Sequence, residues 1–129
     1  MRRTDQRRAA TFASYQRDVT GREQPDEALP PFARELVEGV EENREELDRL
    51  IAENAVGWEL DRIAPLERAI MRIALLEMLH SDIAPSDTPI PPEGAIDEAV
   101  ETAKKFCGAD APGFVNGILS AALRENVPR

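Results

Sequence analysis

Apolar residues recur at intervals of three and four along most of the chain, and no segment alternates apolar and polar residues over the length of a strand. This spacing gathers side chains on one face of an α-helix and predicts an all-α protein. We expect helices over approximately residues 4–17, 31–40, 41–55, 65–80, 95–107 and 111–126. The stretch 41–55 either continues the preceding helix or restarts it, with Gly39 marking a break or a close contact.

The helix expected over 65–80 is apolar on two sides. One side carries Leu66, Ala69, Ile70, Ile73 and Ala74, and the other carries Met71, Leu75, Met78 and Leu79. Apolar residues on two sides of a helix require neighbours on both. We therefore place this helix in the centre of a bundle.

Two other helices show one apolar stripe each. Near the N-terminus the stripe comprises Ala9, Phe12, Ala13 and Val19, opposite Arg3, Arg7, Thr11 and Ser14. Over 95–107 it comprises Ile96, Ala99, Val100, Ala103 and Phe106. Each stripe predicts the face that packs on the core. Gly108 stands where glycine commonly ends a helix.

Charge is distributed unevenly along the chain. The formal net charge is −9, yet residues 1–22 carry six arginines against two aspartates. The overall negative charge favours solubility, but a local basic segment can still bind a polyanion through phosphate contacts and counterion release. Any nucleic acid that binds should therefore do so at one end or face.

Length and composition indicate one domain over residues 1–129. With 42% hydrophobic residues, the chain can bury an aliphatic core. The most apolar stretch, 69–79, is interrupted by Arg72 and Glu77 and is too short to span a bilayer, and the basic start is not followed by the apolar region of a secretory signal. The single cysteine cannot form an internal disulfide, so we expect a cytoplasmic, reducing environment.

The patterns that would indicate catalysis or a metal are incomplete. Glu77 and His80 have the i, i+3 spacing of helical di-iron sites, but such sites need a second histidine, and this chain has one. His80 is better suited to interact with free carbonyls at a helix end. Cys107 lacks a neighbouring histidine to activate it. We expect a protein without enzymatic activity, cofactor or metal.

The segment FVNGIL, residues 114–119, places Asn116 and Gly117 inside a favourable helix. Glycine there costs about 1 kcal/mol relative to alanine, so we interpret Gly117 as allowing close helix packing and Asn116 as satisfying a buried polar group. Phe114 is expected to be exposed as a stacking platform for a base. Asp110 either caps this helix or accepts a hydrogen bond from a base edge.

Several segments, taken in order, resemble the NusB family of transcription antitermination factors. They are the arginine-rich start with ASYQ, then WELDRIAPLERAIMRIALLEML, IDEAVETAKKFCG and FVNGIL. The resemblance implies a NusB-like bundle of about six to seven helices in two packed three-helix halves. It also implies a non-enzymatic protein that pairs with NusE, a ribosomal small-subunit protein, and grips single-stranded boxA RNA in the transcription elongation complex. The proline-rich loop at 84–95 is longer than its usual counterpart.

The resemblance places RNA against the N-terminal arginines, in agreement with the charge distribution. The RNA-binding residues that we expect are Arg2, Arg3, Arg7, Arg8, Asp110 and Phe114. The residues expected to face NusE are Tyr15 and Glu77; a partner there would explain a carboxylate on an apolar stripe. The alternative is a structural module without RNA binding, in which the two-sided apolar helix forms a homodimer and the arginines pair with an acidic surface of a neighbouring copy.

Overall fold

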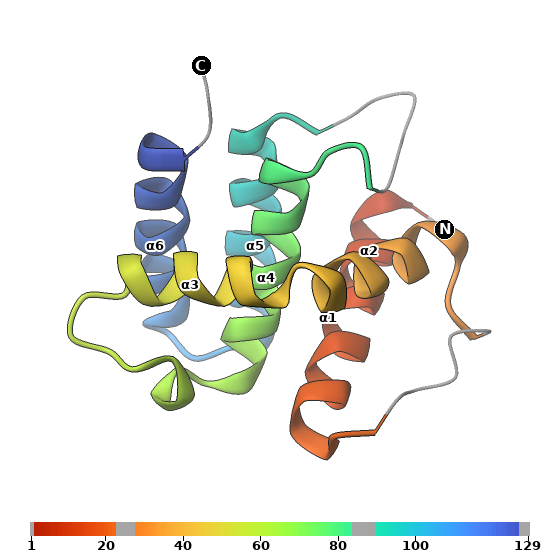
Figure 1. The fold of residues 1–129 in the computed structure, drawn as a ribbon, viewed down its shortest axis with the longest axis horizontal. Helices are drawn as coiled ribbons and strands as arrows, with labels where there is room; N and C mark the ends of the chain where they lie inside the picture. Colours follow the sequence, from red (N-terminus) through yellow and green to blue (C-terminus); the bar gives the residue numbers. More distant parts are fainter. Residues whose placement is uncertain (1, 23–27, 84–89, 127–129) are drawn as a thin grey trace.

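The computed structural model describes residues 2–22, 28–83 and 90–126 (Figure 1). Over these residues it contains six α-helices, short 3-10 segments and no strand. The elements are α1 (Arg3–Thr20), α2 (Pro31–Glu42), α3 (Arg44–Asn54), the 3-10 helix η2 (Leu60–Arg62), α4 (Pro65–Leu79), α5 (Pro92–Phe106) and α6 (Ala111–Asn126). The prediction of an all-α fold is confirmed. Most of the proline-rich loop, at 84–89, lies outside the described residues.

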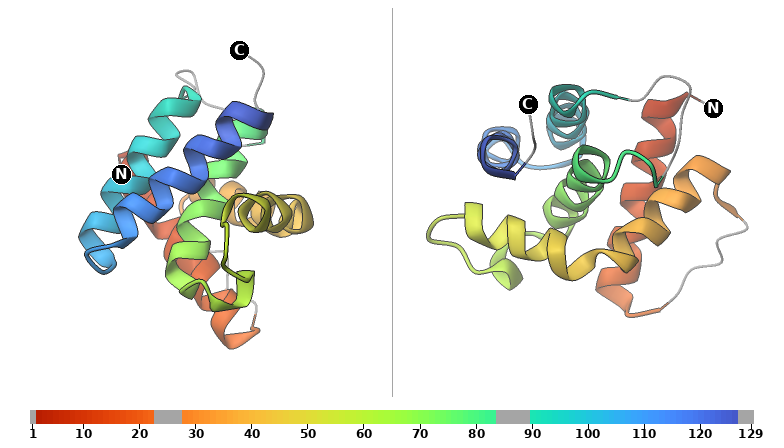
Figure 2. Two further views of the ribbon diagram at one scale, coloured as in Figure 1. Left: turned by 90° about the vertical axis from the view of Figure 1, so that its left-hand side faces the viewer. Right: turned by 45° about the horizontal axis from the view of Figure 1, so that its top comes forward.

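Helix α4 lies in the centre of the bundle and packs against each of the other five α-helices. Every residue from Ala69 to Met78 is buried, as expected for a helix with two apolar sides. Helices α1 and α2 lie side by side at one end of the molecule and α4–α6 lie at the other, while α3 runs across α4 and reaches α6 (Figure 1 and Figure 2). No helix in the described ranges is both long and apolar enough to cross a membrane.

Local signals explain where most helices start and stop. Pro31, Pro65 and Pro92 occupy the first positions of α2, α4 and α5, where a missing N–H removes no hydrogen bond. Helix α1 ends at Gly21, whose left-handed φ of 70° lets its N–H donate to the Arg17 carbonyl. Gly108 was expected to play the same role after α5, but it does not adopt a positive φ.

The break between α2 and α3 falls at Asn43, so the chain restarts a helix rather than continuing one. The Asn43 side chain donates to the Gly39 carbonyl at 2.8 Å. Gly39 itself is a close contact, because a Cβ there would lie 2.8 Å from the side chains of both Leu76 and Ile83.

The prediction of the buried face of α1 is wrong in part, although the two alanines of the expected stripe pack against the core. Thr11 and Ser14, placed on the solvent side, are 4% and 2% exposed, whereas Val19 is 53% exposed. Helix α1 packs against both α2 and α4, and small side chains allow these helices to approach. The buried Thr11 hydroxyl has a hydrogen-bond partner, because it donates to the Arg7 carbonyl at 2.9 Å.

Arg72, one of the two charges that interrupt the apolar sequence of α4, is 2% exposed and fully paired. Its guanidinium donates to both oxygens of Asp48 on α3, at 2.6 and 3.1 Å, and to Asp18 on α1, at 3.1 Å. Asp18 also accepts from Arg44 and Arg68. This ion-pair cluster ties α1, α3 and α4 together, because a buried charge is tolerated only when it is paired.

Candidate nucleic-acid interface

Of the four arginines expected to bind RNA, Arg2 lies at the surface near the start of α1, and Arg3 and Arg8 lie against aromatic rings. Arg2 has an 82% exposed side chain, 3.3 Å from Asp5. The Arg3 guanidinium carbon lies 4.1 Å from the ring centre of Phe32 on α2. Arg8 points toward the far end of α5, and its Nε is buried without a hydrogen-bond partner among the described residues. These guanidiniums can therefore add phosphate contacts without first breaking a buried ion pair.

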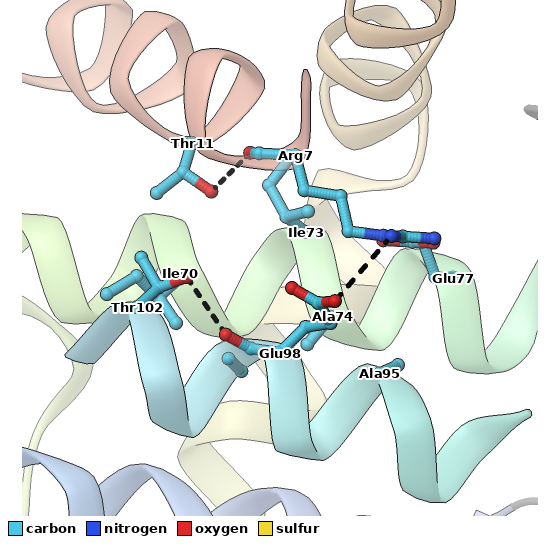
Figure 3. Close-up of a pocket in the computed structure, with 10 residues that line it drawn as sticks. Arg7, Thr11, Ile70, Ile73, Ala74, Glu77, Ala95, Glu98 and Thr102 are labelled. Carbon is cyan, nitrogen blue, oxygen red and sulfur yellow. Dashed lines mark hydrogen bonds and ion pairs between the residues drawn. The ribbon is translucent and has the colours of Figure 1, made fainter. Parts of the chain in front are cut away.

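Arg7 is placed differently, because it pairs with Glu77 of α4 (Figure 3). The Arg7 Nε donates to both Glu77 oxygens, at 2.8 and 3.0 Å. The two side chains are 13% and 9% exposed. Burial raises the pKa of the Glu77 carboxyl, and the opposing hydrogen bonds and charge of Arg7 do not fully offset this. Within this chain, Arg7 is already the partner that a carboxylate on an apolar stripe requires.

A small pocket lies beside this pair at the junction of α1, α4 and α5 (Figure 3). Its volume is about 20 Å³, which is room for one water molecule and no larger ligand. Glu98 lies across it from Glu77 and accepts a hydrogen bond from Thr4 at 2.8 Å. The junction is thus a site of polar contacts within the protein.

The start of α6 carries the second group of expected RNA contacts. Asp110 is exposed, and its carbonyl accepts the Phe114 N–H at 3.2 Å. Phe114 is half-buried rather than fully exposed, and its ring lies edge-on to Trp58, with centroids 5.7 Å apart. Trp58 is 53% exposed. A hollow of about 430 Å³ opens beside these two rings, so a flat aromatic ligand can reach them.

The thiol of Cys107 lies near this hollow without being activated. Burial raises its pKa, and the charge of Glu67 raises it further. The pKa of Glu67 is itself raised by burial. Because the thiolate is the nucleophile, these shifts make Cys107 less reactive than an ordinary cysteine. The described residues also contain no cluster of three or more His, Cys, Asp or Glu side chains that could hold a metal.

The interpretation of Asn116 and Gly117 as packing residues is wrong. Both are exposed, and a Cβ on Gly117 would meet nothing within 4 Å. Asn116 accepts a hydrogen bond from Ser120, one turn further along the same helix, at 3.3 Å. These residues face outward from α6, so helix packing does not account for the glycine.

The structure separates the two groups of expected RNA contacts, because α4 and α5 stand between α1 and α6 (Figure 1). Sequence reasoning also missed an exposed aromatic residue at the end of α5. Phe106, the last residue of α5, was expected in the core but is 40% exposed. Its ring meets Phe12 of α1 edge-on, with centroids 4.9 Å apart. The two lysines that precede it in KKFCG were the available signal that this part of the helix is solvated.

The residues expected to face NusE lie on different helices, Tyr15 on α1 and Glu77 on α4. Tyr15 is half-buried and follows Arg7, the partner of Glu77, by two helical turns, or about 12 Å. A partner protein that contacts Tyr15 and Glu77 must therefore extend along the helix. His80 does not bind helix-end carbonyls as expected, because its Nε2 lies 2.6 Å from Glu46 of α3.

Comparisons with known proteins agree with this architecture. The family model described as the NusB family matches residues 2–124. A transcription antitermination protein NusB from Geobacillus kaustophilus is 43% identical over 137 residues, covering 97% of this chain and 100% of that protein. One from Symbiobacterium thermophilum is 46% identical over 99 residues, covering 77% of this chain but only 61% of that protein.

Two solved structures share the fold along nearly the whole chain. T. maritima NusB superimposes with a TM-score of 0.81 at 31% identity, covering 99% of this chain and 94% of that one. A chain from a crystal structure described as a plectonemic RNA supercoil superimposes with a TM-score of 0.78 at 27% identity, covering 96% of both chains. The chain belongs to the NusB family.

Proposed function

We propose that this protein is a transcription antitermination factor that binds single-stranded boxA-type RNA together with NusE and promotes processive elongation, especially of ribosomal RNA operons. The observation that carries the proposal is the family match over residues 2–124, combined with a cluster of arginines at the start of α1 in an otherwise acidic protein. The protein acts in the cytoplasm, without enzymatic activity or a cofactor.

In this proposal the arginines of α1 contact phosphates, and α6 contacts bases. Arg2, Arg3 and Arg8 provide charge at the surface, and each phosphate contact releases counterions from the RNA. Phe114 stacks on a base beside Trp58, while Asp110 accepts a hydrogen bond from a base edge. Arg7 joins the phosphate contacts only when it gives up its bond to Glu77.

NusE contacts Tyr15 and the rim of the Glu77 site. The 9% exposure of Glu77 leaves little of it for a partner to touch, so the contact requires a group that reaches into the junction of α1 and α4. Glu77→Gln tests this contact better than a charge reversal, because a lysine at position 77 would face Arg7 and strain the fold.

The decisive experiment is a titration of the protein with a boxA RNA at several salt concentrations, with and without NusE. Replacing Arg3 and Arg7 with alanine should weaken binding and reduce the log–log salt slope by about 0.7 for each phosphate that the variant no longer neutralises. Arg49→Ala is the control, because Arg49 is an exposed arginine of α3 that pairs with Glu53. Equal affinity and slope for the wild type and the Arg3/Arg7 variant would overturn the assignment.

The alternative of a structural homodimer loses its main support. That model used the two apolar faces of the 65–80 helix as a dimer surface, but other helices of the same chain cover both faces of α4. Sedimentation measurements would test whether the protein forms a homodimer through another surface.

A further inference from the structure

We propose that Phe106 is a stacking platform for an RNA base, with Arg8 and Lys105 holding the phosphates on either side of that base. The proposal rests on the RNA-binding function proposed above and adds a contact point at the end of α5. It would make the two separated groups of RNA contacts parts of one continuous path.

Phe106 is exposed, although the apolar pattern of its helix predicts that it is buried. Over the described residues, the exposed large hydrophobic side chains are Val19, Val56, Trp58 and Phe106. The perpendicular contact with Phe12, at 88° and 4.9 Å between centroids, holds the ring in place, and the side chain remains 40% exposed. A ring held in this way loses little conformational entropy when a base stacks on it.

Two positively charged side chains lie beside the Phe106 ring. The Arg8 guanidinium carbon lies 5.9 Å from the Phe106 centroid, and Lys105 Nζ lies 5.5 Å from it. Proteins that bind single strands combine aromatic rings, which stack with bases, and cations, which follow the backbone. The buried, unpartnered Nε of Arg8 marks this guanidinium as one whose hydrogen-bonding capacity is not used up by the described residues.

The position of Phe106, against α1 and shortly before α6, also supports the proposal. Phe106 touches α1 through Phe12 and ends the helix that leads into the turn with Asp110 and then into the start of α6, where Phe114 lies. A strand that leaves the arginines of α1 for the start of α6 has to pass α5, which lies between them (Figure 1). An acidic peptide could also meet these cations, but it would have no flat face to place on the ring. A nucleotide in a single strand has both the flat face and the charge.

The test compares Phe106→Leu with Phe106→Tyr. Leucine keeps an apolar contact with Phe12 but removes the aromatic face, whereas tyrosine keeps both. With a boxA RNA as the probe, Phe106→Leu should weaken binding by between about 5-fold and about 140-fold, with an unchanged salt slope, and Phe106→Tyr should bind like the wild type. Arg8→Ala should instead reduce the slope by about 0.7.

A second probe separates stacking from other effects. The probes are boxA RNA analogues that each lack one base. For one of these analogues, the wild type and Phe106→Leu should bind with equal affinity, because the base that stacks on Phe106 is missing. Val56→Ala, a change at a residue 90% exposed in another loop, is the control and should change nothing. Thermal unfolding checks that each variant is folded.

Two results would overturn the inference while leaving the proposed function intact. One is wild-type RNA affinity for Phe106→Leu while the Arg3/Arg7 variant binds more weakly. The other is a Phe106→Leu variant that binds RNA normally but no longer binds NusE, which would make this ring a protein contact. If the wild-type protein does not bind the RNA in the presence or absence of NusE, both proposals are wrong.

Discussion

Arg7 donates from Nε to both carboxylate oxygens of Glu77, at 2.8 and 3.0 Å. The residue expected to bind RNA and the residue expected to face NusE are therefore partners of each other. If a phosphate draws Arg7 away, Glu77 loses its cation, and if NusE occupies Glu77, Arg7 is released. Under the function proposed above, RNA and NusE would then each change the affinity of the protein for the other, and the two effects would be equal because such coupling is reciprocal.

The pair should also contribute to stability. Arg7→Ala leaves the Glu77 carboxylate buried without a partner and should lower the free energy of unfolding at pH 7 by about 3 kcal/mol. The loss should shrink toward pH 4, because a protonated Glu77 no longer needs a cation. The double variant with Glu77→Gln should recover at least half of the loss. Urea denaturation across this pH range measures the free energy of unfolding of the wild type and both variants. An equal loss in the single and double variants would show that Arg7 does not stabilise the protein through its pairing with Glu77.

The Asp18 cluster should make the protein sensitive to acid. Burial alone would raise the pKa of Asp18, but the charge and hydrogen bonds of Arg72 and Arg44 outweigh it, and the pKa is lowered. A lowered pKa means that the unfolded chain binds the proton more readily. The stability from this carboxylate is therefore complete above the unfolded pKa of about 3.9 and is lost as the pH falls through the folded pKa.

Asp18→Asn tests this directly. The variant should be less stable than the wild type by roughly 3 kcal/mol at pH 7, because the arginines around it lose a shared acceptor. The difference should narrow as the pH falls from about 5 to about 3. Asp61→Asn, at an exposed position of η2, provides the matched control. A constant difference between Asp18→Asn and the wild type at every pH would contradict the assigned role.

Gly39 and Gly117 should respond in opposite ways to the same substitution. Gly39→Ala pushes a methyl group to 2.8 Å from the side chains of Leu76 and Ile83 and should cost about 1–3 kcal/mol by overpacking. Gly117→Ala meets open space and should add up to about 1 kcal/mol through helix propensity. Thermal denaturation of the two variants side by side checks both. A stabilised Gly117→Ala with weaker RNA binding would show that the glycine serves ligand approach.

Phe114→Ala should affect both RNA binding and stability. The ring is half-buried against Trp58 and the core, so we expect a stability loss of about 1–2 kcal/mol, below the roughly 3–5 kcal/mol of a fully buried phenylalanine. RNA affinity should fall by about 5-fold or more. Trp58 is the only tryptophan, so its fluorescence reports on the contact. Unchanged RNA affinity in the folded variant would remove Phe114 from the interface.

Asp110→Asn should separate capping from recognition at the start of α6. Asparagine caps a helix about as well as aspartate, so thermal stability should stay within about 0.5 kcal/mol. Replacing a carboxylate oxygen by an amino group changes an acceptor into a donor, so the preference among RNAs that differ at one base should change. Titration with a set of singly substituted boxA RNAs measures that preference, and an identical ranking for variant and wild type would assign Asp110 to the helix alone.

Local rules of the chain were enough to determine the helices and the place of α4. Prolines start three of the helices because they need no N–H partner there, and a helix with two apolar sides has to be central. These features depend on a few neighbouring residues, so they can be seen in the sequence. Family resemblance, carried by contiguous motifs, is determined in the same way.

Tertiary structure decided which faces and charges are used. Thr11 and Ser14 are buried because α1 touches two helices at once, which no single stripe reveals. Arg7 meets Glu77 across 70 positions of sequence, and Phe106 is exposed at the last position of α5 although its ring meets Phe12 of α1. Periodicity describes one helix at a time, whereas pairing and exposure depend on which helices meet and how closely they can approach.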